Sequence, residues 1–302
     1  MELGIIGLGK MGANMAERLH KGGHRIVGFD RDSRAVEAIV TQGNEGAASI
    51  VELVSKLKTP RVVWIMVPAG KPVDDTIESL IPEMKRGDVL IDGGNSYYKD
   101  SMRRAQRLAG LGINMLDAGV SGGIWGLKEG YSIMVGGEKK AVDSVKPLFE
   151  TLAPGKDKGW GYVGPSGSGH FVKMVHNGIE YGLMEAYAEG FELLRKKSEF
   201  NLDLHKIAEI WRFGSVVRSW LLDLTADALK ADQQLQGIEP YVADSGEGRW
   251  TALEAIELGV SLPVITQSLY ERFSSQDTEE FGGRLLAMMR HEFGGHAVKE
   301  GK

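Results

Sequence analysis

The chain has 302 residues, enough for two domains that each bury a core of their own. Its formal net charge is −5, with 36 basic and 41 acidic residues, so no positive excess indicates binding to nucleic acid. The absence of cysteine excludes disulfides, thiolate metal sites and a cysteine nucleophile. No cationic leader and no run of roughly 18 apolar residues is present, so we expect a cytoplasmic protein without membrane contact.

The first half of the chain alternates between short apolar runs and helical patterns. The apolar runs are bounded by glycine and predict strands at residues 3–6, 25–29, 62–67, 89–91, 115–120 and 131–135. Helical stretches separate most of them, as at residues 11–21, 73–84 and 101–111. This alternation is typical of βαβ units in a mostly parallel sheet. We therefore predict a Rossmann-like α/β domain over residues 1–165.

Strand signals stop after residue 169, and the rest of the chain has helical periodicity. The predicted helices cover residues 169–197, 204–213, 219–230, 250–258, 263–273 and 278–291. A segment rich in Gly, Lys, Pro and Ser, residues 155–169, precedes them. We predict that residues 166–302 form a second, all-helical domain.

Two segments match the G-x-G-x-x-G pattern of dinucleotide-binding loops. The first is Gly7-Leu8-Gly9-Lys10-Met11-Gly12, between a predicted strand and a predicted helix. Its glycines would let the backbone approach a pyrophosphate at the helix N-terminus, where free amides favour negative charge. The second match, residues 159–164, is followed by Pro165 and a Gly/Ser run. We predict a dinucleotide site at the first match and a turn or linker at the second.

Asp30 ends the second predicted strand, 23 residues after Gly7. A carboxylate there can accept hydrogen bonds from both adenosine ribose hydroxyls and would repel a 2′-phosphate. The sequence therefore predicts NAD rather than NADP. Arg31 keeps NADP possible, because a guanidinium beside the ribose could neutralise a phosphate.

A polar face runs along the predicted helix 169–197. At about 100° per residue, its members lie within a sector of roughly 140°: Lys173, His176, Asn177, Glu180 and Tyr181. Lys173 and Glu180 are about 10.5 Å apart along the axis, too far for the usual salt bridge between successive turns. The face suits a base and an acid on either side of a small molecule, and the alternative is an ordinary solvated surface.

Five motifs together resemble a known family. They are residues 7–12, 92–96 (Asp-Gly-Gly-Asn-Ser), 117–123 (Asp-Ala-Gly-Val-Ser-Gly-Gly), 167–181 and 290–296. They are similar to the β-hydroxyacid dehydrogenase superfamily and, more narrowly, to the short form of decarboxylating 6-phosphogluconate dehydrogenase. The resemblance runs from residue 1 to about residue 296. It implies oxidation and decarboxylation of 6-phospho-D-gluconate to D-ribulose 5-phosphate and CO2, with reduction of NAD(P), in the pentose phosphate pathway.

The resemblance also implies a role for each matching residue. Lys173 would be the general base and Glu180 the general acid. The substrate carboxylate and hydroxyls would be held by Asn177, His176, Ser121, Gly122 and Gly123. Asn95 would lie near the nicotinamide, and Val67 and Ala69 would line the cofactor. The phosphate would be held by Tyr181, Arg272, Arg290 and His296, the last two from a neighbouring subunit of a homodimer or homotetramer.

The chemistry requires no metal, because Lys173, once protonated, could stabilise the developing oxyanion. As a base it must first be neutral near pH 7, which requires a pKa lowered by burial or by neighbouring positive charge.

One loop departs from the family pattern. Ser245 stands where the longer enzymes have a phosphate-binding lysine, and Glu247 adds negative charge, although Arg249 could compensate.

Two other functions stay open. The first alternative is a dehydrogenase or reductase of a short β-hydroxy acid, without decarboxylation. The second is a non-catalytic NAD-binding sensor. Glu180, Arg272 and Arg290 favour the phosphogluconate enzyme over the first alternative. The complete polar face favours an enzyme over the second alternative.

Overall fold

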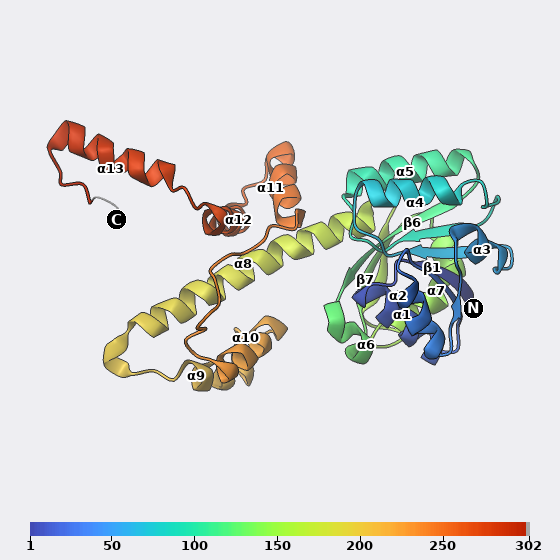
Figure 1. Ribbon diagram of the computed structural model, residues 1–302, viewed down its shortest axis with the longest axis horizontal. Coiled ribbons are helices and arrows are strands. Elements are labelled where there is room, and N and C mark those ends of the chain that lie inside the picture. Colours follow the sequence, from blue (N-terminus) through green and yellow to red (C-terminus); the bar gives the residue numbers. More distant parts are fainter. Residues whose placement is uncertain (300–302) are drawn as a thin grey trace. The chain divides into compact units, whose positions relative to one another are not determined.

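The computed structural model describes residues 1–299. Internal contacts divide the chain into two compact units, one of Met1–Asn177 and one that starts at Gly178 (Figure 1). No helix of the described residues is both long and apolar enough to cross a lipid bilayer.

The described part of the first unit contains one eight-stranded sheet. Its strands are β1 (Glu2–Ile6), β2 (Arg25–Phe29), β3 (Glu45–Gly46), β4 (Val62–Ile65), β5 (Val89–Asp92), β6 (Asn114–Ser121), β7 (Ser132–Gly136) and β8 (Trp160–Gly164). The spatial order is β3-β2-β1-β4-β5-β6-β7-β8, and only β6 and β7 pair antiparallel. The first six strands have the order of the Rossmann fold, in which β1 and β4 flank the point where the strand order reverses. The predicted Rossmann-like, mostly parallel sheet is confirmed.

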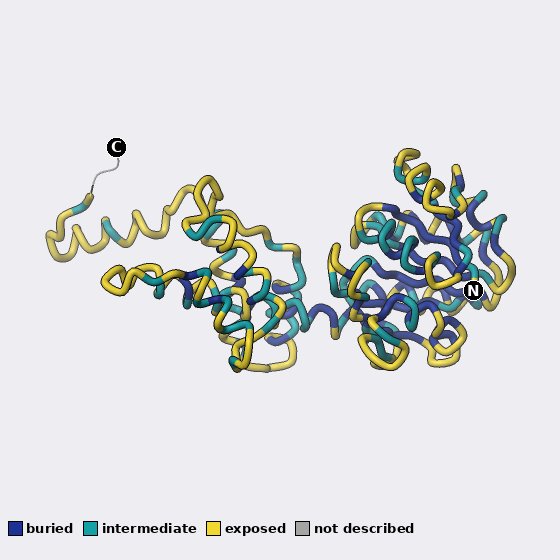
Figure 2. Tube along the Cα trace, turned by 90° about the horizontal axis from the view of Figure 1, so that it is seen from below, coloured by how far each residue is buried: buried dark blue, intermediate teal, exposed yellow. Residues whose placement is uncertain are grey.

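Helices cover both faces of this sheet. One face packs on α1 (Lys10–Lys21), α2 (Ser33–Thr41) and α7 (Lys139–Leu152), and the other on α3 (Ile50–Ser55), α4 (Lys71–Leu80) and α5 (Tyr98–Gly110). Successive strand residues point to opposite faces, so Trp64 joins the first layer while Val63 and Ile65 join the second. The short α6 (Gly126–Glu129) follows a 3-10 turn after β6. The strands are mostly buried, and the tube in Figure 2 shows dark blue segments in the interior of the first unit.

The expectation that residues 159–164 form a turn or linker is wrong. Residues Trp160–Gly164 are strand β8, which pairs parallel to β7 at the edge of the sheet. Trp160 stacks on Phe149 of α7 with ring centroids 5.5 Å apart, and its Nε1 donates a hydrogen bond to the carbonyl of Lys156. Glycine lowers the intrinsic preference for a strand, but pairing with β7 and packing of the tryptophan outweigh it.

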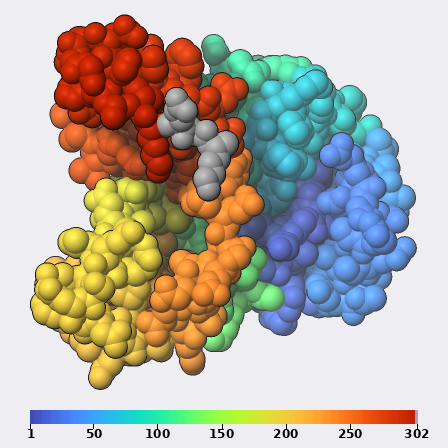
Figure 3. Space-filling view, turned by 60° about the vertical axis from the view of Figure 1, so that its left-hand side comes forward, coloured from blue at the N-terminus to red at the C-terminus, as the bar shows by residue number. Residues whose placement is uncertain are grey.

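The second unit is helical, as predicted. Helix α8 (Ser168–Lys196) starts in the first unit and continues into the second, which also contains α9 (Leu204–Arg212), α10 (Trp220–Ala231), α11 (Glu247–Leu258), α12 (Pro263–Gln276) and α13 (Phe281–Gly294). A small core joins α8, α9 and α10 through Phe191, Ala208 and Leu222. Helix α13 has no buried residue, and its side chains lie within the red part of the surface in Figure 3.

Candidate active site

The loop between β1 and α1 has the backbone of a dinucleotide-binding turn. Gly7 has φ +94°, and a Cβ there would lie 2.5 Å from the carbonyl oxygen of Met66. A Cβ on Gly12 would lie 2.0 Å from the carbonyl oxygen of Gly7, so only glycine lets α1 approach the strand this closely. A Cβ on Gly9, in contrast, would meet no atom within 4 Å. Gly9 therefore borders open space at the N-terminus of α1, where a pyrophosphate can approach the backbone amides.

Asp30 lies directly after β2 and holds this loop in place. Its Oδ2 accepts a hydrogen bond from the Leu8 amide at 2.6 Å, and its Oδ1 accepts one from the Asp32 amide at 2.9 Å. An ionised carboxylate has about four acceptor positions, so two remain for ribose hydroxyls. The neighbouring Arg31 is exposed.

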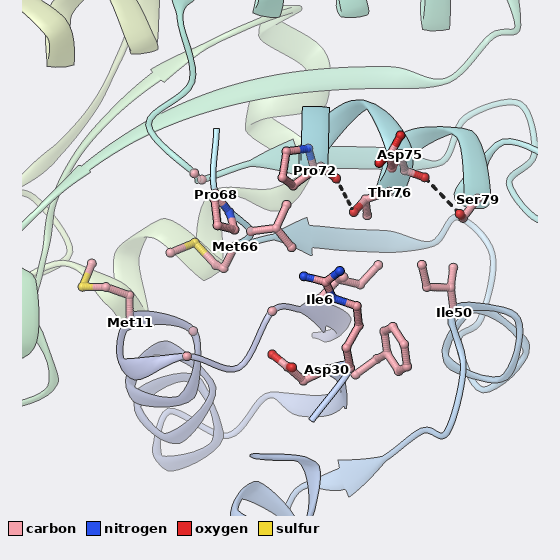
Figure 4. Close-up of a pocket in the computed structure, with 18 of the residues that line it drawn as sticks. Ile6, Met11, Asp30, Ile50, Met66, Pro68, Pro72, Asp75, Thr76 and Ser79 are labelled. Atoms are coloured by element: carbon pink, nitrogen blue, oxygen red, sulfur yellow. Dashed lines mark hydrogen bonds between the residues drawn. The ribbon is translucent and has the colours of Figure 1, made fainter. Parts of the chain in front are cut away.

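A pocket of about 780 Å³ opens beside the loop (Figure 4). Of the residues predicted to bind the cofactor, those that line it are Gly7, Gly9, Lys10, Met11, Gly12, Asp30, Arg31, Val67 and Asn95. Leu8 and Ala69 are not among the lining residues, and the Leu8 side chain packs in the core. Sequence reasoning missed Pro72, Thr76 and Ser79 of α4. They could have been predicted from the Rossmann topology, because α4 follows β4, which pairs with β1 where the strand order reverses.

A buried arginine joins the loops that follow β4 and β5, which border this pocket. Arg104 of α5 is 2% exposed and donates from Nε to Asp74 Oδ1 at 2.8 Å and from Nη2 to the Gly70 carbonyl at 3.0 Å. Its Nη1 lies 3.5 Å from Oδ2 of Asp92, which also accepts from Ser96 Oγ at 2.7 Å. The hydrogen bond from Arg104 holds the pKa of Asp74 below its usual value. The loops after β4 and β5 are thereby tied together.

Asn95 is fixed against strand β6. Its Nδ2 donates to the Val120 carbonyl at 3.2 Å, and its Oδ1 accepts from the Val120 amide at 3.0 Å. The residue has φ +52°, a conformation that asparagine tolerates better than most residues. It therefore lies both on the wall of the pocket and next to Ser121.

Lys173 of α8 is the centre of a polar cluster. The residue is 5% exposed, and its Nζ donates to Asn177 Oδ1 at 2.5 Å and lies 3.4 Å from His176 Nδ1. On the other side of the imidazole, His176 Nε2 is 3.5 Å from Ser121 Oγ. Gly122 and Gly123 follow Ser121 with φ of +128° and +51°. The structure thus brings together Lys173, His176, Asn177 and the Ser121 loop, which are among the residues predicted to contact the substrate. Glu180, half-buried, lies farther along the same helix.

A second polar cluster surrounds Tyr181 in the helical unit. The Tyr181 hydroxyl is 3.0 Å from Ser245 Oγ, and the Arg272 guanidinium stacks on the phenol ring at 3.5 Å from its centroid. Ser245 Oγ donates to Glu247 Oε2 at 2.6 Å.

Arg249, the proposed substitute for the missing lysine, instead pairs with Asp244 at 2.8 Å. The other two residues predicted to contact the phosphate, Arg290 and His296, are exposed on and just after α13.

The Rossmann sheet, the glycine loop with its pocket and the buried Lys173 are the features of a dinucleotide-dependent oxidoreductase. A sequence model described as the NAD binding domain of 6-phosphogluconate dehydrogenase matches residues 2–164, and one for the C-terminal domain of that enzyme matches residues 169–291. The chain belongs to the 6-phosphogluconate dehydrogenase family. The expected NAD(P) cofactor is thereby confirmed.

Individual relatives agree with this assignment. The chain is 45% identical over 299 residues to an NAD(+)-dependent, decarboxylating 6-phosphogluconate dehydrogenase of Haloferax volcanii, covering 99% of this chain and 98% of that protein. A structure of Plasmodium falciparum 6-phosphogluconate dehydrogenase superposes with a TM-score of 0.85 at 30% identity, over 100% of this chain and 67% of that one. A 3-hydroxyisobutyrate dehydrogenase of Mycobacterium tuberculosis has a TM-score of 0.73 at 22% identity, over 91% and 94% of the two chains, which shows a shared fold.

Proposed function

We propose that the protein oxidises and decarboxylates 6-phospho-D-gluconate to D-ribulose 5-phosphate and CO2, with NAD as the preferred cofactor. The observation that carries this proposal is the buried Lys173, with Asn177, His176 and Ser121 around it. Likeness over nearly the whole length to a decarboxylating relative supports it. The reaction would belong to gluconate use and the pentose phosphate pathway.

Lys173 is suited to act as the general base. Burial disfavours the charged form of an amine, and a neutral amine can take the proton from the substrate hydroxyl at carbon 3. Bound NAD would supply the acceptor for the hydride from the same carbon. The resulting β-keto acid loses its carboxyl group as the bond between carbons 1 and 2 breaks, and the electron pair forms an enediol. The ammonium of Lys173 stabilises the oxyanion, and Glu180 returns a proton to carbon 2 of the original substrate.

The cofactor would bind along the glycine loop. The open space at Gly9 leaves room for a pyrophosphate against the N-terminus of α1. Asp30 would accept hydrogen bonds from the adenosine ribose, which favours NAD over NADP.

The direct test is a steady-state assay of the purified protein. With NAD and 6-phosphogluconate, we expect CO2 and NADH in equal amounts, and a higher kcat/KM with NAD than with NADP. Oxidation of 3-hydroxyisobutyrate without any response to 6-phosphogluconate would disprove the proposal.

A second candidate is oxidation of a short, unphosphorylated β-hydroxy acid. The observation that favours it is the loop beside Tyr181, where Ser245 bonds to Glu247 and Arg249 is neutralised by Asp244. Inorganic phosphate distinguishes the two candidates. It should compete with the substrate of a phosphogluconate enzyme and have no effect on an enzyme for unphosphorylated acids.

A further inference from the structure

The first turn of α8 is capped by a carboxylate from the sheet. Asp117 of β6 is 2% exposed, and it accepts hydrogen bonds from the Gly167 amide at 2.7 Å and the His170 amide at 3.0 Å. Helix N-termini leave such amides without partners inside the helix, and a carboxylate also favours the positive end of the helix dipole. Asp117 thus ties the start of α8 to a strand about 50 residues earlier.

Three positions on one face of β6 meet three successive turns of α8. Asp117 accepts from the amide of His170, a Cβ on Gly119 would lie 2.3 Å from Cβ of Lys173, and Ser121 Oγ is 3.5 Å from His176. Alternate strand residues share one face, and helix residues three apart share another. The contacts with β6 therefore fix both the position of α8 along its own axis and its rotation about that axis.

A second hydrogen bond holds the same turn from the side. Nδ1 of the buried His170 is 2.7 Å from Ser101 Oγ of α5. Sliding α8 by one residue would move Lys173 by about 1.5 Å along the helix axis and 100° around it. Either change would carry the amine away from Ser121.

We propose that Asp117 is a positioning residue, which places the Lys173 amine for proton transfer through the cap on α8, with help from His170 and Ser101. The inference rests on the proposed role of Lys173 as base, and it does not depend on which hydroxy acid is oxidised.

The test is Asp117→Asn, with Asp88→Asn as the matched control. An asparagine has the same shape, but its amide can accept from only one of the two backbone donors. Asp88 is equally buried and also accepts two backbone hydrogen bonds, from the amides of Arg61 and Lys85, at the opposite end of the sheet. Displacement of a reacting group by about 1 Å can lower a rate about 100-fold. We expect kcat to fall by about that factor in Asp117→Asn, with KM for NAD unchanged, and kcat to be retained in Asp88→Asn.

A second measurement keeps this inference separate from the proposed substrate. Amide hydrogen exchange over residues 167–176 should become faster in Asp117→Asn and stay unchanged in Asp88→Asn, whether or not the wild type turns over 6-phosphogluconate. If the wild type oxidises 3-hydroxyisobutyrate instead, the same comparison of kcat applies with that substrate, and only the proposed function fails.

Unchanged kcat or unchanged exchange in Asp117→Asn would overturn the inference, as would an equal loss of kcat in Asp88→Asn. If Asp117→Asn does not fold, Ser101→Ala replaces it, because this smaller change removes the hydrogen bond to His170 and, besides it, a 3.4 Å hydrogen bond to the Tyr97 carbonyl within α5. We then expect a lower kcat at unchanged KM for NAD, and wild-type kcat would contradict the inference.

Discussion

Lys173 combines burial with hydrogen-bonding neighbours, an unusual environment for a lysine. In Lys173→Met the side chain keeps its approximate length but can no longer accept a proton. Loss of a general base typically lowers the rate about 10²- to 10⁴-fold. We expect kcat to fall by at least about 10²-fold. NADH binding, followed by its fluorescence, should be unchanged. Lys140→Met, at an exposed position of α7, is the control, and near-wild-type turnover of Lys173→Met would remove Lys173 as the base.

Asp30 is the residue on which cofactor preference depends. Asp30→Ser removes the negative charge that would repel a 2′-phosphate, together with a charged acceptor for the ribose. A hydrogen bond to a charged group contributes about 1.5–3 kcal/mol. The ratio of kcat/KM with NAD to kcat/KM with NADP should therefore fall about 10- to 100-fold. Asp32→Asn, two positions away and exposed, should keep the wild-type ratio. A wild-type enzyme that prefers NADP would contradict the role given to Asp30.

Single residues could be predicted where their partners are close in sequence. Lys173, His176 and Asn177 share one helical turn, and the glycine loop is continuous, so their spacing alone indicated them. Contacts across long separations could not be read in this way: Ser121 meets His176 across 55 residues, and Tyr181 meets Ser245 across 64. The pairing of Arg249 with Asp244 likewise depends on how a loop folds back on itself.

At the scale of elements, close packing of α8 on the sheet depends on glycine. A Cβ on Gly119 would lie 2.3 Å from Cβ of Lys173, so Gly119→Ala must displace the helix or the strand. Overpacking typically costs about 1–3 kcal/mol in the free energy of unfolding. We expect that loss in denaturant titrations, accompanied by a large loss of kcat.

The control for this substitution is Gly161→Ala. A Cβ on Gly161 in β8 would meet no atom within 4 Å, so stability and turnover should stay near those of the wild type. If Gly119→Ala behaves in the same way, the helix is not held against β6 as closely as described.

The secondary structure followed from periodicity where one pattern dominated. The strand over residues 25–29 and the long helix near residues 169–197 agree closely with β2 and α8. Strand β8 could not be predicted, because two of its five residues are glycine and a partner strand supplies its stability. The limits of a strand at a sheet edge depend on its neighbour, which local sequence does not contain.

At the scale of the whole molecule, α13 leaves large apolar side chains uncovered. They are Phe281, Leu285, Leu286, Met288, Met289 and Phe293. Apolar area of this kind commonly marks a contact surface, and we expect a homodimer or homotetramer. In sedimentation velocity, the double variant Leu286→Asp/Phe293→Asp should shift toward the monomer. We also expect its KM for 6-phosphogluconate to rise, because Arg290 and His296 would no longer reach a neighbouring site.

Val51→Asp is the control for this pair, since Val51 is an exposed apolar residue on α3 of the first unit. A wild-type protein that sediments as a monomer at concentrations where it is active would contradict the prediction.

Every residue that lines the 780 Å³ pocket belongs to the first 95 positions of the chain, whereas the Tyr181 cluster lies wholly in the helical unit. If the coenzyme binds in this pocket and the substrate phosphate near Tyr181, as proposed, mutations that change coenzyme preference fall on a different compact unit from those that change phosphate binding. Selection could then act on one of these preferences without changing the other. A lineage could then exchange one nicotinamide coenzyme for the other through changes around β2 alone, while its hydroxy acid stays the same.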